Sequence, residues 1–213
     1  MKIALLAGGT GLIGSQLLQL LVENDAYSTI KCLTRRELPL THNKIEVIQT
    51  DGSNLDTLAP SLAADDVFCC LGTTIKKAKT KEAFRRIDFD YPRHLANLSK
   101  AAGAKQFLLI SALGANPSSS VFYNKVKGEV EETIAAIGFD AYHIFRPSLL
   151  LGPRPEERSG EDTAKLFFKL FEFLIPVKYK AIDSSKVARA MISMANKNGR
   201  GIFVYESKLL QSF

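Results

Sequence analysis

Cysteine is scarce in this chain, and long apolar runs are absent. The 213 residues include three cysteines, at positions 32, 69 and 70, each in a short apolar stretch. An odd number without C-x-x-C spacing argues against a zinc site or a disulfide framework, and such cysteines usually pack as small apolar residues in a reducing compartment. No apolar run reaches the roughly 18 residues that a membrane-spanning helix needs. We therefore expect a cytoplasmic protein without a metal site or a membrane partner.

Charge is not concentrated enough to indicate a nucleic-acid partner. The formal net charge is +6, and 23% of the residues are charged against 46% hydrophobic, which is ordinary for a globular protein. Basic residues do gather in KKAKTKEAFRR at 76–86, a pattern that fits either recruitment of an anionic ligand or a solvated helix face. No aromatic residue alternates with these charges before Phe84. A binding platform for single-stranded nucleic acid is therefore not expected.

Repeats, low-complexity tracts and linkers are also missing, and the length fits one domain with a single core. The first apolar run, in MKIALLAGG, is read as a buried strand, because it is short for a signal peptide and no small-residue cleavage site follows. Buried strands are predicted at 3–7, 30–33, 45–48, 67–71, 107–110 and 142–145. Helices are predicted between them, at 12–23, 54–63, 81–102 and 121–137. This alternation predicts an α/β fold, a doubly wound parallel sheet with right-handed crossovers.

The last third of the chain changes character. A loop is predicted at 146–162, an apolar helix at 163–175, an amphipathic helix at 184–197 capped by Asp183 or Ser184, and a final strand at 201–205. This part is too small for a second domain, so we expect one domain over 1–213, with 148–213 adding a small cap on the substrate side. The phenylalanines of the apolar helix fit the core, a substrate pocket or a subunit contact.

Three glycines spaced three apart lie between the first strand and the first helix. Such a turn lets the chain reverse sharply and approach a pyrophosphate closely, and the start of the helix offers unpaired N–H groups to phosphates. No Lys-Ser/Thr pair follows, so the motif is not a P-loop. We predict nucleotide binding, the alternative being a purely structural turn. The expected contacts are Gly8, Thr10, Gly11, Leu12, Ile13 and Gly14.

The end of the second strand indicates which nucleotide binds. Arg35 and Arg36 stand where an NAD-specific site has an acidic residue for the ribose 2′-hydroxyl, whereas a 2′-phosphate favours a guanidinium. We therefore expect NADPH in preference to NADH; a solvated turn is the alternative. Asp51, after the third strand, is predicted to accept a hydrogen bond from the adenine amino group. The residues expected at the same edge after the fourth strand are Gly72, Thr73 and Thr74.

The segment after the fifth strand carries residues suited to hydride-transfer chemistry. Tyr123 and Lys127 are spaced i, i+4 and so share a helix face. When a hydride moves to or from a carbon that bears oxygen, a proton must move on that oxygen. A free tyrosine, with a pKa of about 10, is a poor base at neutral pH, and a nearby ammonium favours the phenolate. Ser111, at the end of the strand, is predicted to hydrogen-bond the substrate oxygen.

Together these motifs resemble those of the short-chain dehydrogenase/reductases of the atypical or extended type. The stretches LISALGANPSSSVFYNKVKGEVE and FRPSLLLGPRPEERSGE resemble the small Tat-interacting-protein-like oxidoreductases within that superfamily. The resemblance implies a Rossmann fold, NADPH as the usual cofactor and a Ser-Tyr-Lys site. It also implies that RPSLLLG, with Pro147 and Leu149, passes by the nicotinamide. A homodimer, where one forms in relatives, pairs helices corresponding to 81–102 and 121–137.

Two positions depart from the family pattern. Many relatives carry two serines after the fifth strand; here the second is Ala112, so the role falls on Ser111, with Ser118–Ser120 as substitutes. Asp88 stands where extended members often have an asparagine that helps hold a proton-relay water. Asp88 either does that work or only caps and spaces its helix.

The expected function is that of an NADPH-dependent oxidoreductase that transfers a hydride to a small carbonyl or related compound, using Ser111, Tyr123 and Lys127. The short C-terminal region argues against a large nucleotide-sugar substrate. The alternative is an NADPH-binding sensor that acts through protein contacts with little or no turnover. Tyr123 and Lys127 favour the enzyme, whereas Asp88 and the single Ser111 keep the sensor open. A nucleic-acid binder would rest on charge alone.

Overall fold

Seven parallel strands form one sheet, in the order β3-β2-β1-β4-β5-β6-β9. The computed structural model describes residues 1–152, 176–197 and 199–213, so the predicted helix 163–175 and most of the loop before it lie outside the described residues. The strands of the sheet are β1 (Lys2–Ala7), β2 (Tyr27–Thr34), β3 (Ile45–Gln49), β4 (Asp66–Cys69), β5 (Gln106–Ile110), β6 (Ala141–Arg146) and β9 (Gly201–Glu206). A small second sheet pairs β7 (Leu150–Leu151) with β8 (Ile182–Asp183). The α/β fold and the predicted strands are confirmed, with ends shifted by a few residues.

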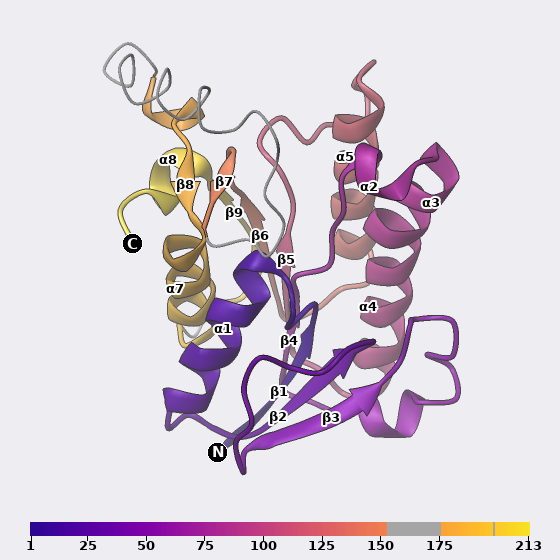
Figure 1. The fold of residues 1–213 in the computed structure, drawn as a ribbon, viewed down its shortest axis with the longest axis vertical. Coiled ribbons are helices and arrows are strands. Elements are labelled where there is room, and N and C mark those ends of the chain that lie inside the picture. The colour runs from indigo at the N-terminus through magenta and orange to yellow at the C-terminus, as the bar shows by residue number, and fades with distance from the viewer. Residues whose placement is uncertain (153–175, 198) are drawn as a thin grey trace.

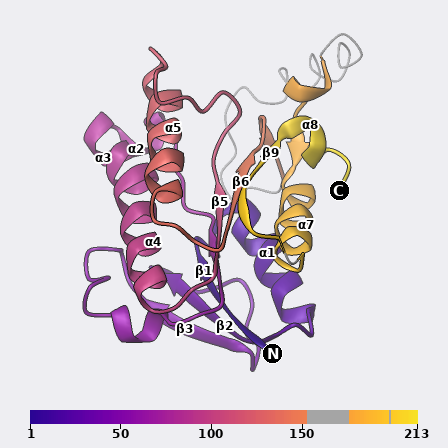
Figure 2. The ribbon, with the colours of Figure 1, turned by 180° about the vertical axis from the view of Figure 1, so that it is seen from behind.

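Helices cover both faces of the sheet (Figures 1 and 2). On one face lie α1 (Leu12–Glu23) and α7 (Ser184–Ala195), and on the other lie α4 (Tyr91–Ala101) and α5 (Phe122–Ala135). In β1, Ala4 and Leu6 join the core under α1 and α7, whereas Leu5 and Ala7 join the core under α4 and α5. Because both faces are covered, the strand sequences are continuously apolar rather than alternating. The shorter helices are Ala59–Leu62, α2 (Ile75–Ala78), α3 (Lys81–Arg85), Arg86–Asp90, Val177–Tyr179 and α8 (Ser207–Leu210).

The helix predicted at 54–63 is wrong. Residues 53–58 form turns, and Ala59–Leu62 forms a short 3-10 helix. Pro60 has no N–H to donate, and its ring opposes a preceding helical turn. The Thr57 hydroxyl donates to the Asn54 carbonyl at 2.8 Å, the kind of local bond that competes with a helix.

The helix predicted at 81–102 contains a π-helical turn. After α3, residues Arg86–Asp90 form this turn, in which the Tyr91 N–H donates to the Arg86 carbonyl. In a regular α-helix, the ring of Pro92 would clash with the carbonyl four residues earlier, that of Asp88, so the wider turn lets the helix continue. It also carries Asp88 inward, where it is 1% exposed. Turns of this kind are frequently found at functional sites.

The described part of 148–213 contributes mainly to the sheet and its helix layer. Helix α7 packs against α1, and β9 pairs in parallel with β6. The Asp183 side chain accepts from the Ser185 N–H at 2.8 Å, which confirms one of the two predicted caps. The expected substrate-side cap stays a prediction. Within the described residues, none of the helices has the length and apolar character needed to cross a membrane.

A buried polar network joins several strands below α7. The His143 ring lies 2.9 Å from the Tyr205 hydroxyl through Nδ1 and 3.3 Å from Gln106 Oε1 through Nε2. Gln106 Nε2 donates in turn to Asp66 Oδ1 at 3.0 Å. Burial lowers the pKa of His143 to about 4, so this histidine is neutral in the folded protein at physiological pH.

We expect His143 to make the fold sensitive to acid. Its folded pKa of about 4 lies below the ordinary 6.5, so the unfolded chain binds the proton first. The contribution of neutral His143 to the free energy of unfolding is fully present above about pH 6.5. It falls by up to about 3 kcal/mol as the pH approaches 4. Urea unfolding checks this against His143→Phe, which retains an aromatic ring beside Phe203. Stability of the wild type should fall more steeply across this range; parallel profiles would contradict the assignment.

Candidate functional site

The predicted site residues lie at the C-terminal ends of the strands, where the strand order reverses between β1 and β4. Helices α1 and α5 both begin at this edge, on opposite faces of the sheet (Figure 1). In open α/β sheets, ligands bind in the crevice outside this point.

The three glycines of the first turn have different roles. Gly8 has a φ of +89°, and a Cβ on it would lie 2.6 Å from the Cys70 carbonyl oxygen. A Cβ on Gly14 would lie 2.1 Å from the Gly8 oxygen. Both glycines are therefore required by the fold itself. A Cβ on Gly11 would meet one described atom within 4 Å, the Gly8 oxygen at 3.2 Å. The fold leaves space beside Gly11 that the described chain does not fill.

The start of α1 is open toward a ligand. Gly11 is its N-cap residue, no described side chain caps it, and its first turn holds no acidic residue. The first N–H groups of a helix lack intrahelical partners and lie at its positive end. The Ile13 side chain belongs to the core, and a Cβ on Gly152 would lie 2.8 Å from Leu12 Cδ1. Leu12 and Ile13 thus offer a ligand mainly their backbone N–H groups.

The structure brings Arg36 to the glycine turn. The Thr34 hydroxyl donates to the Arg36 carbonyl at 2.7 Å and accepts from the Arg36 N–H at 3.1 Å, which fixes the chain after β2. The Arg36 guanidinium then reaches the Thr10 hydroxyl at 3.4 Å. Arg35 and Arg36 are both exposed, so their charges are accessible beside the turn.

Asp51 lies in an exposed turn after β3. Its carboxylate accepts from the Ser53 hydroxyl at 2.5 Å and from the Ser53 N–H at 2.9 Å. These bonds, with a smaller effect of Arg86, hold the pKa of Asp51 below its ordinary value. Gly52, with a φ of +91°, lies against the Tyr91 ring, where a Cβ would come within 2.5 Å. The adenine contact predicted for Asp51 stays a prediction. The Asp-Gly pair at 51–52 is the sequence signal for the turn in which Gly52 adopts its positive φ.

Asp88 connects two parts of the predicted site. Its Oδ2 accepts from the Thr73 N–H at 2.9 Å, and its Oδ1 lies 2.8 Å from the Lys127 ammonium. The side chains of Asp88 and Lys127 are 0% and 5% exposed. A Cβ on Gly72 would lie 3.5 Å from Asp88 Oδ1, so Gly72 borders this ion pair. The Thr74 hydroxyl accepts from the backbone N–H of residue 77 and caps α2.

Lys127 is held as a buried cation. Burial by itself disfavours its ammonium, but Asp88 and, more weakly, Tyr123 outweigh burial and hold the pKa of Lys127 above its ordinary value. The ammonium also lies 3.4 Å from the Ile110 carbonyl at the end of β5. Asp88 therefore does more than space its helix, while a part for it in proton relay stays a prediction.

Tyr123 lies on α5 one turn before Lys127, and its side chain is half-buried. Its ring is tilted against Phe84 at 5.5 Å between centroids, and Phe122 packs on the same ring at 5.7 Å. Phe84 is fully buried and fixes the start of α5. Sequence reasoning missed this role, although a phenylalanine within a run of basic residues is a signal for a buried position.

Ser111 has a different partner from the one expected. Its buried hydroxyl donates to a carboxylate oxygen of Glu131, and no hydrogen bond among the described residues joins it to Tyr123 or Lys127. Sequence reasoning missed Glu131, which follows Lys127 by four positions and so shares its helix face. Of the substitutes at 118–120, Ser119 accepts from the Val121 N–H at 3.1 Å just before α5.

The segment predicted to pass the nicotinamide follows β6 at the same edge. Pro147 is buried, and its carbonyl accepts from the Leu113 N–H at 2.9 Å. Leu149 is 53% exposed, while its carbonyl accepts from the Ile182 N–H at 2.8 Å. The backbone is thus fixed between the loop after β5 and the small second sheet.

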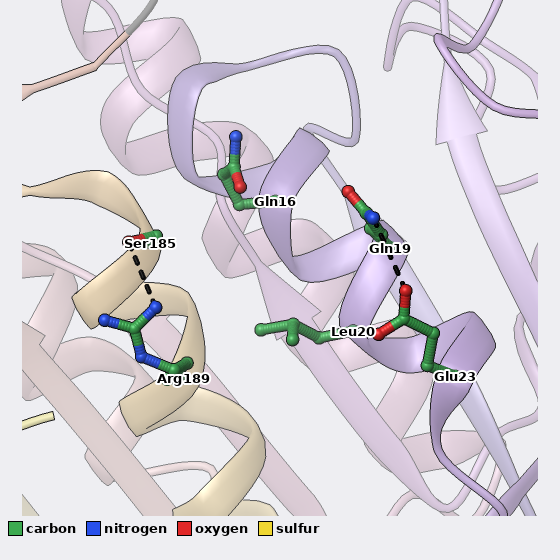
Figure 3. A pocket seen from close by; sticks show the side chains of 6 residues that line it. All are labelled: Gln16, Gln19, Leu20, Glu23, Ser185 and Arg189. Carbon is green, nitrogen blue, oxygen red and sulfur yellow. Dashed lines mark hydrogen bonds between the residues drawn. The ribbon is translucent and has the colours of Figure 1, made fainter.

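Other parts of the surface offer less chemistry. Within residues 1–152, 176–197 and 199–213, His, Cys, Asp and Glu side chains form no group of three or more placed for a metal ion. A shallow groove between α1 and α7 contains none of the predicted site residues (Figure 3). Two of its hydrogen bonds run along a single helix, Gln19 to Glu23 at 3.4 Å and Arg189 to Ser185 at 3.1 Å, and Arg189 also donates to the Phe213 carbonyl at 3.1 Å.

Comparison with known proteins identifies the family. A family described as NAD(P)H-binding matches residues 8–198. Protein HTATIP2 of Rattus norvegicus is 37% identical over 204 residues, 94% of this chain and 84% of that protein. Protein FMP52, mitochondrial, of Candida albicans is 34% identical over 91% of this chain and 88% of that protein.

Solved structures show the same fold at lower identity. The Bordetella bronchiseptica enzyme WbmH in complex with NAD⁺ is 18% identical, with a TM-score of 0.73 over 97% of this chain and 76% of that chain. MoeE5 in complex with UDP-glucuronic acid and NAD is 19% identical, with a TM-score of 0.74 over 94% and 74%. The chain therefore belongs to the NAD(P)H-binding family of Rossmann-fold proteins, on the atypical branch of the short-chain dehydrogenase/reductases.

Proposed function

We propose that this protein is an NADPH-dependent oxidoreductase that acts on a small carbonyl or related compound. The observation that carries the proposal is the buried Lys127–Asp88 ion pair, 2.8 Å between Nζ and Oδ1, one helical turn from Tyr123. It lies at the edge of the sheet where the uncapped start of α1 opens. A lysine whose pKa is held above its ordinary value, one helical turn from a tyrosine, suits proton transfer.

The described residues fit the cofactor. The space beside Gly11 and the uncapped N–H groups of α1 suit a pyrophosphate. Arg36, bonded to Thr10, and the neighbouring Arg35 suit a 2′-phosphate. Asp51 is assigned to the adenine, and Pro147 and Leu149 are assigned to the nicotinamide side. Gly72, Thr73 and Thr74 are assigned to the same cofactor site.

Bound NADPH would supply a hydride to the carbonyl carbon of the substrate. Tyr123 then donates its hydroxyl proton to the substrate oxygen, and in the reverse direction its phenolate accepts that proton. The Lys127 ammonium lies on the same helix face, one turn from Tyr123. Asp88 holds this ammonium in place. A substrate contact from Ser111 would require its hydroxyl to leave Glu131.

We expect NADPH to bind at least about tenfold more tightly than NADH, because a guanidinium–phosphate pair is charge-assisted and can be bidentate. Calorimetric titration of both cofactors measures the preference. In Arg35→Ala/Arg36→Ala, affinity for NADPH should fall to that for NADH, and affinity for NADH should change little. Equal affinities in the wild type, or an unchanged NADPH affinity in the double variant, would contradict the assignment.

A second function is favoured by a specific observation. Ser111 is engaged by Glu131 and residue 112 is alanine, an arrangement that suits an NADPH-binding sensor without turnover. Incubation of the protein with NADPH and a panel of small aldehydes and ketones separates the two. The proposal predicts that at least one compound consumes NADPH above background. Tight NADPH binding without consumption by any compound would favour the sensor.

A further inference from the structure

Glu131 lies at a junction between helix α5 and the ends of three strands. It follows Lys127 by one helical turn and Tyr123 by two, on the same face of α5. Ser111 comes directly after β5, Arg146 ends β6, and Glu206 ends β9. The role proposed above for Tyr123 and Lys127 uses none of these four residues.

The contacts at this junction are specific. Arg146 donates from Nε to Glu131 Oε1 at 3.0 Å and from Nη2 to Glu131 Oε2 at 2.5 Å, a bidentate pair. The Ser111 hydroxyl donates to Oε1 of the same carboxylate. The remaining Arg146 donor group reaches Glu206 Oε1 at 2.9 Å. The side chain of Glu131 is 6% exposed and that of Arg146 is 24% exposed.

An ion pair of this kind is a poor source of stability. Removing two charges from water costs several kcal/mol for each ion, and their attraction restores this only when the geometry is good. Apolar side chains in its place would often be equally stable. The bidentate pair instead fixes the relative orientation of the two side chains, because a planar guanidinium binds a carboxylate in a restricted set of orientations. This geometry therefore orients the elements that carry Glu131 and Arg146, helix α5 and the end of β6.

Each residue of the pair belongs to an element that carries proposed site residues: Glu131 lies on α5 with Tyr123 and Lys127, and Arg146 directly precedes Pro147. Through Glu131, the pair holds α5, whose Lys127 reaches the Ile110 carbonyl. Through Arg146, it holds the start of Pro147–Leu149, and the Pro147 carbonyl accepts from the loop that follows Ser111. The pair thus joins the helix of Tyr123 to the segment that follows β6.

We propose that Ser111, Glu131 and Arg146 form a positioning set that fixes α5 against Pro147–Leu149, so that the chain holds the nicotinamide half of the cofactor in one orientation beside Tyr123. The inference rests on the proposed function. It makes Ser111 a positioning residue that acts through Glu131, in place of the substrate contact predicted for it.

Binding of two ligands to a double variant tests the set. Glu131→Gln/Arg146→Met removes both charges, so neither is left buried without its partner. NADPH spans both halves of the site, whereas adenosine 2′,5′-bisphosphate probes the adenine side alone. We expect the dissociation constant of NADPH to rise about three- to tenfold as preorganisation is lost, and the fluorescence anisotropy of the bound nicotinamide to fall. Affinity for adenosine 2′,5′-bisphosphate should stay within about twofold of the wild type, by the same argument.

Control variants make the outcome specific. Arg189→Met removes an arginine from α7, outside the site, and should leave both ligands and the anisotropy unchanged. Glu131→Gln alone keeps the side-chain shape and is measured in the same way if the double variant does not fold. It should also weaken NADPH binding and lower the nicotinamide anisotropy. Ser111→Ala should lower the nicotinamide anisotropy; wild-type anisotropy in that variant would overturn the assignment of Ser111.

Two results would overturn the inference as a whole. Equal losses of affinity for NADPH and adenosine 2′,5′-bisphosphate would show a general structural role, and wild-type NADPH binding and anisotropy in a folded double variant would show no role. Failure of the wild type to bind NADPH would instead overturn the proposed function, and this inference with it.

Discussion

Replacing Gly11 with valine is expected to abolish NADPH binding while leaving the chain folded. A Cβ at this position lies 3.2 Å from the Gly8 oxygen and meets no other described atom within 4 Å. The fold can accept it with a shift of a few tenths of an ångström. The added side chain would instead occupy the space beside the uncapped start of α1, where a pyrophosphate must approach the backbone.

Circular dichroism and calorimetric titration with NADPH check this expectation together. Gly14→Ala is the contrasting variant, because its Cβ would lie 2.1 Å from the Gly8 oxygen. That variant should lose stability and not only affinity. A folded Gly11→Val protein that binds NADPH normally would mean that the glycine turn is purely structural.

Replacing Tyr123 with phenylalanine is expected to lower turnover by roughly 10²–10⁴-fold, the usual contribution of a general acid–base group. The change removes one hydroxyl and keeps the ring that packs on Phe84. The fold and the affinity for NADPH should therefore be retained.

Lys127→Met should lower both the rate and the affinity for the cofactor. It also leaves the buried Asp88 carboxylate without its partner, at a cost of about 3–5 kcal/mol of stability, so Lys127→Met/Asp88→Asn is the matched variant that removes the pair. If Tyr123→Phe turns over as fast as the wild type on the same substrate, proton transfer belongs to another residue.

The fold was predictable because its signals are local. Continuous apolar runs mark strands buried on both faces, as in β1 and β5, and the spacing of apolar residues marks α1 and α7. The false helix at 54–63 had the same apolar spacing, but Pro60 and the side-chain bonds near Asn54 prevailed over it. The π-helical turn before Pro92 likewise depends on a backbone adjustment that periodicity does not show.

The site was predictable in its residue types but not in its contacts. Three glycines are identical in a sequence, and only the neighbouring backbone distinguishes Gly11, beside open space, from Gly8 and Gly14. Ser111 was recognised as a strand-end serine, yet the sequence could not show that Glu131, 20 positions later, would hold its hydroxyl. Lys127 and Asp88 form an ion pair near the ends of β4 and β5. They are 39 positions apart in the chain, and no local pattern encodes such a contact.

Transfer of isotope from the cofactor tests the central proposal most directly. The protein is incubated with NADPH that carries deuterium at both positions of nicotinamide C4 and with the carbonyl panel described above, and the products are examined by mass spectrometry and NMR. The proposal predicts a product that carries one deuterium on the carbon that bore the carbonyl oxygen, formed far more slowly by Tyr123→Phe. Tight binding of the labelled cofactor without labelled product from any compound would contradict the enzyme and support the sensor.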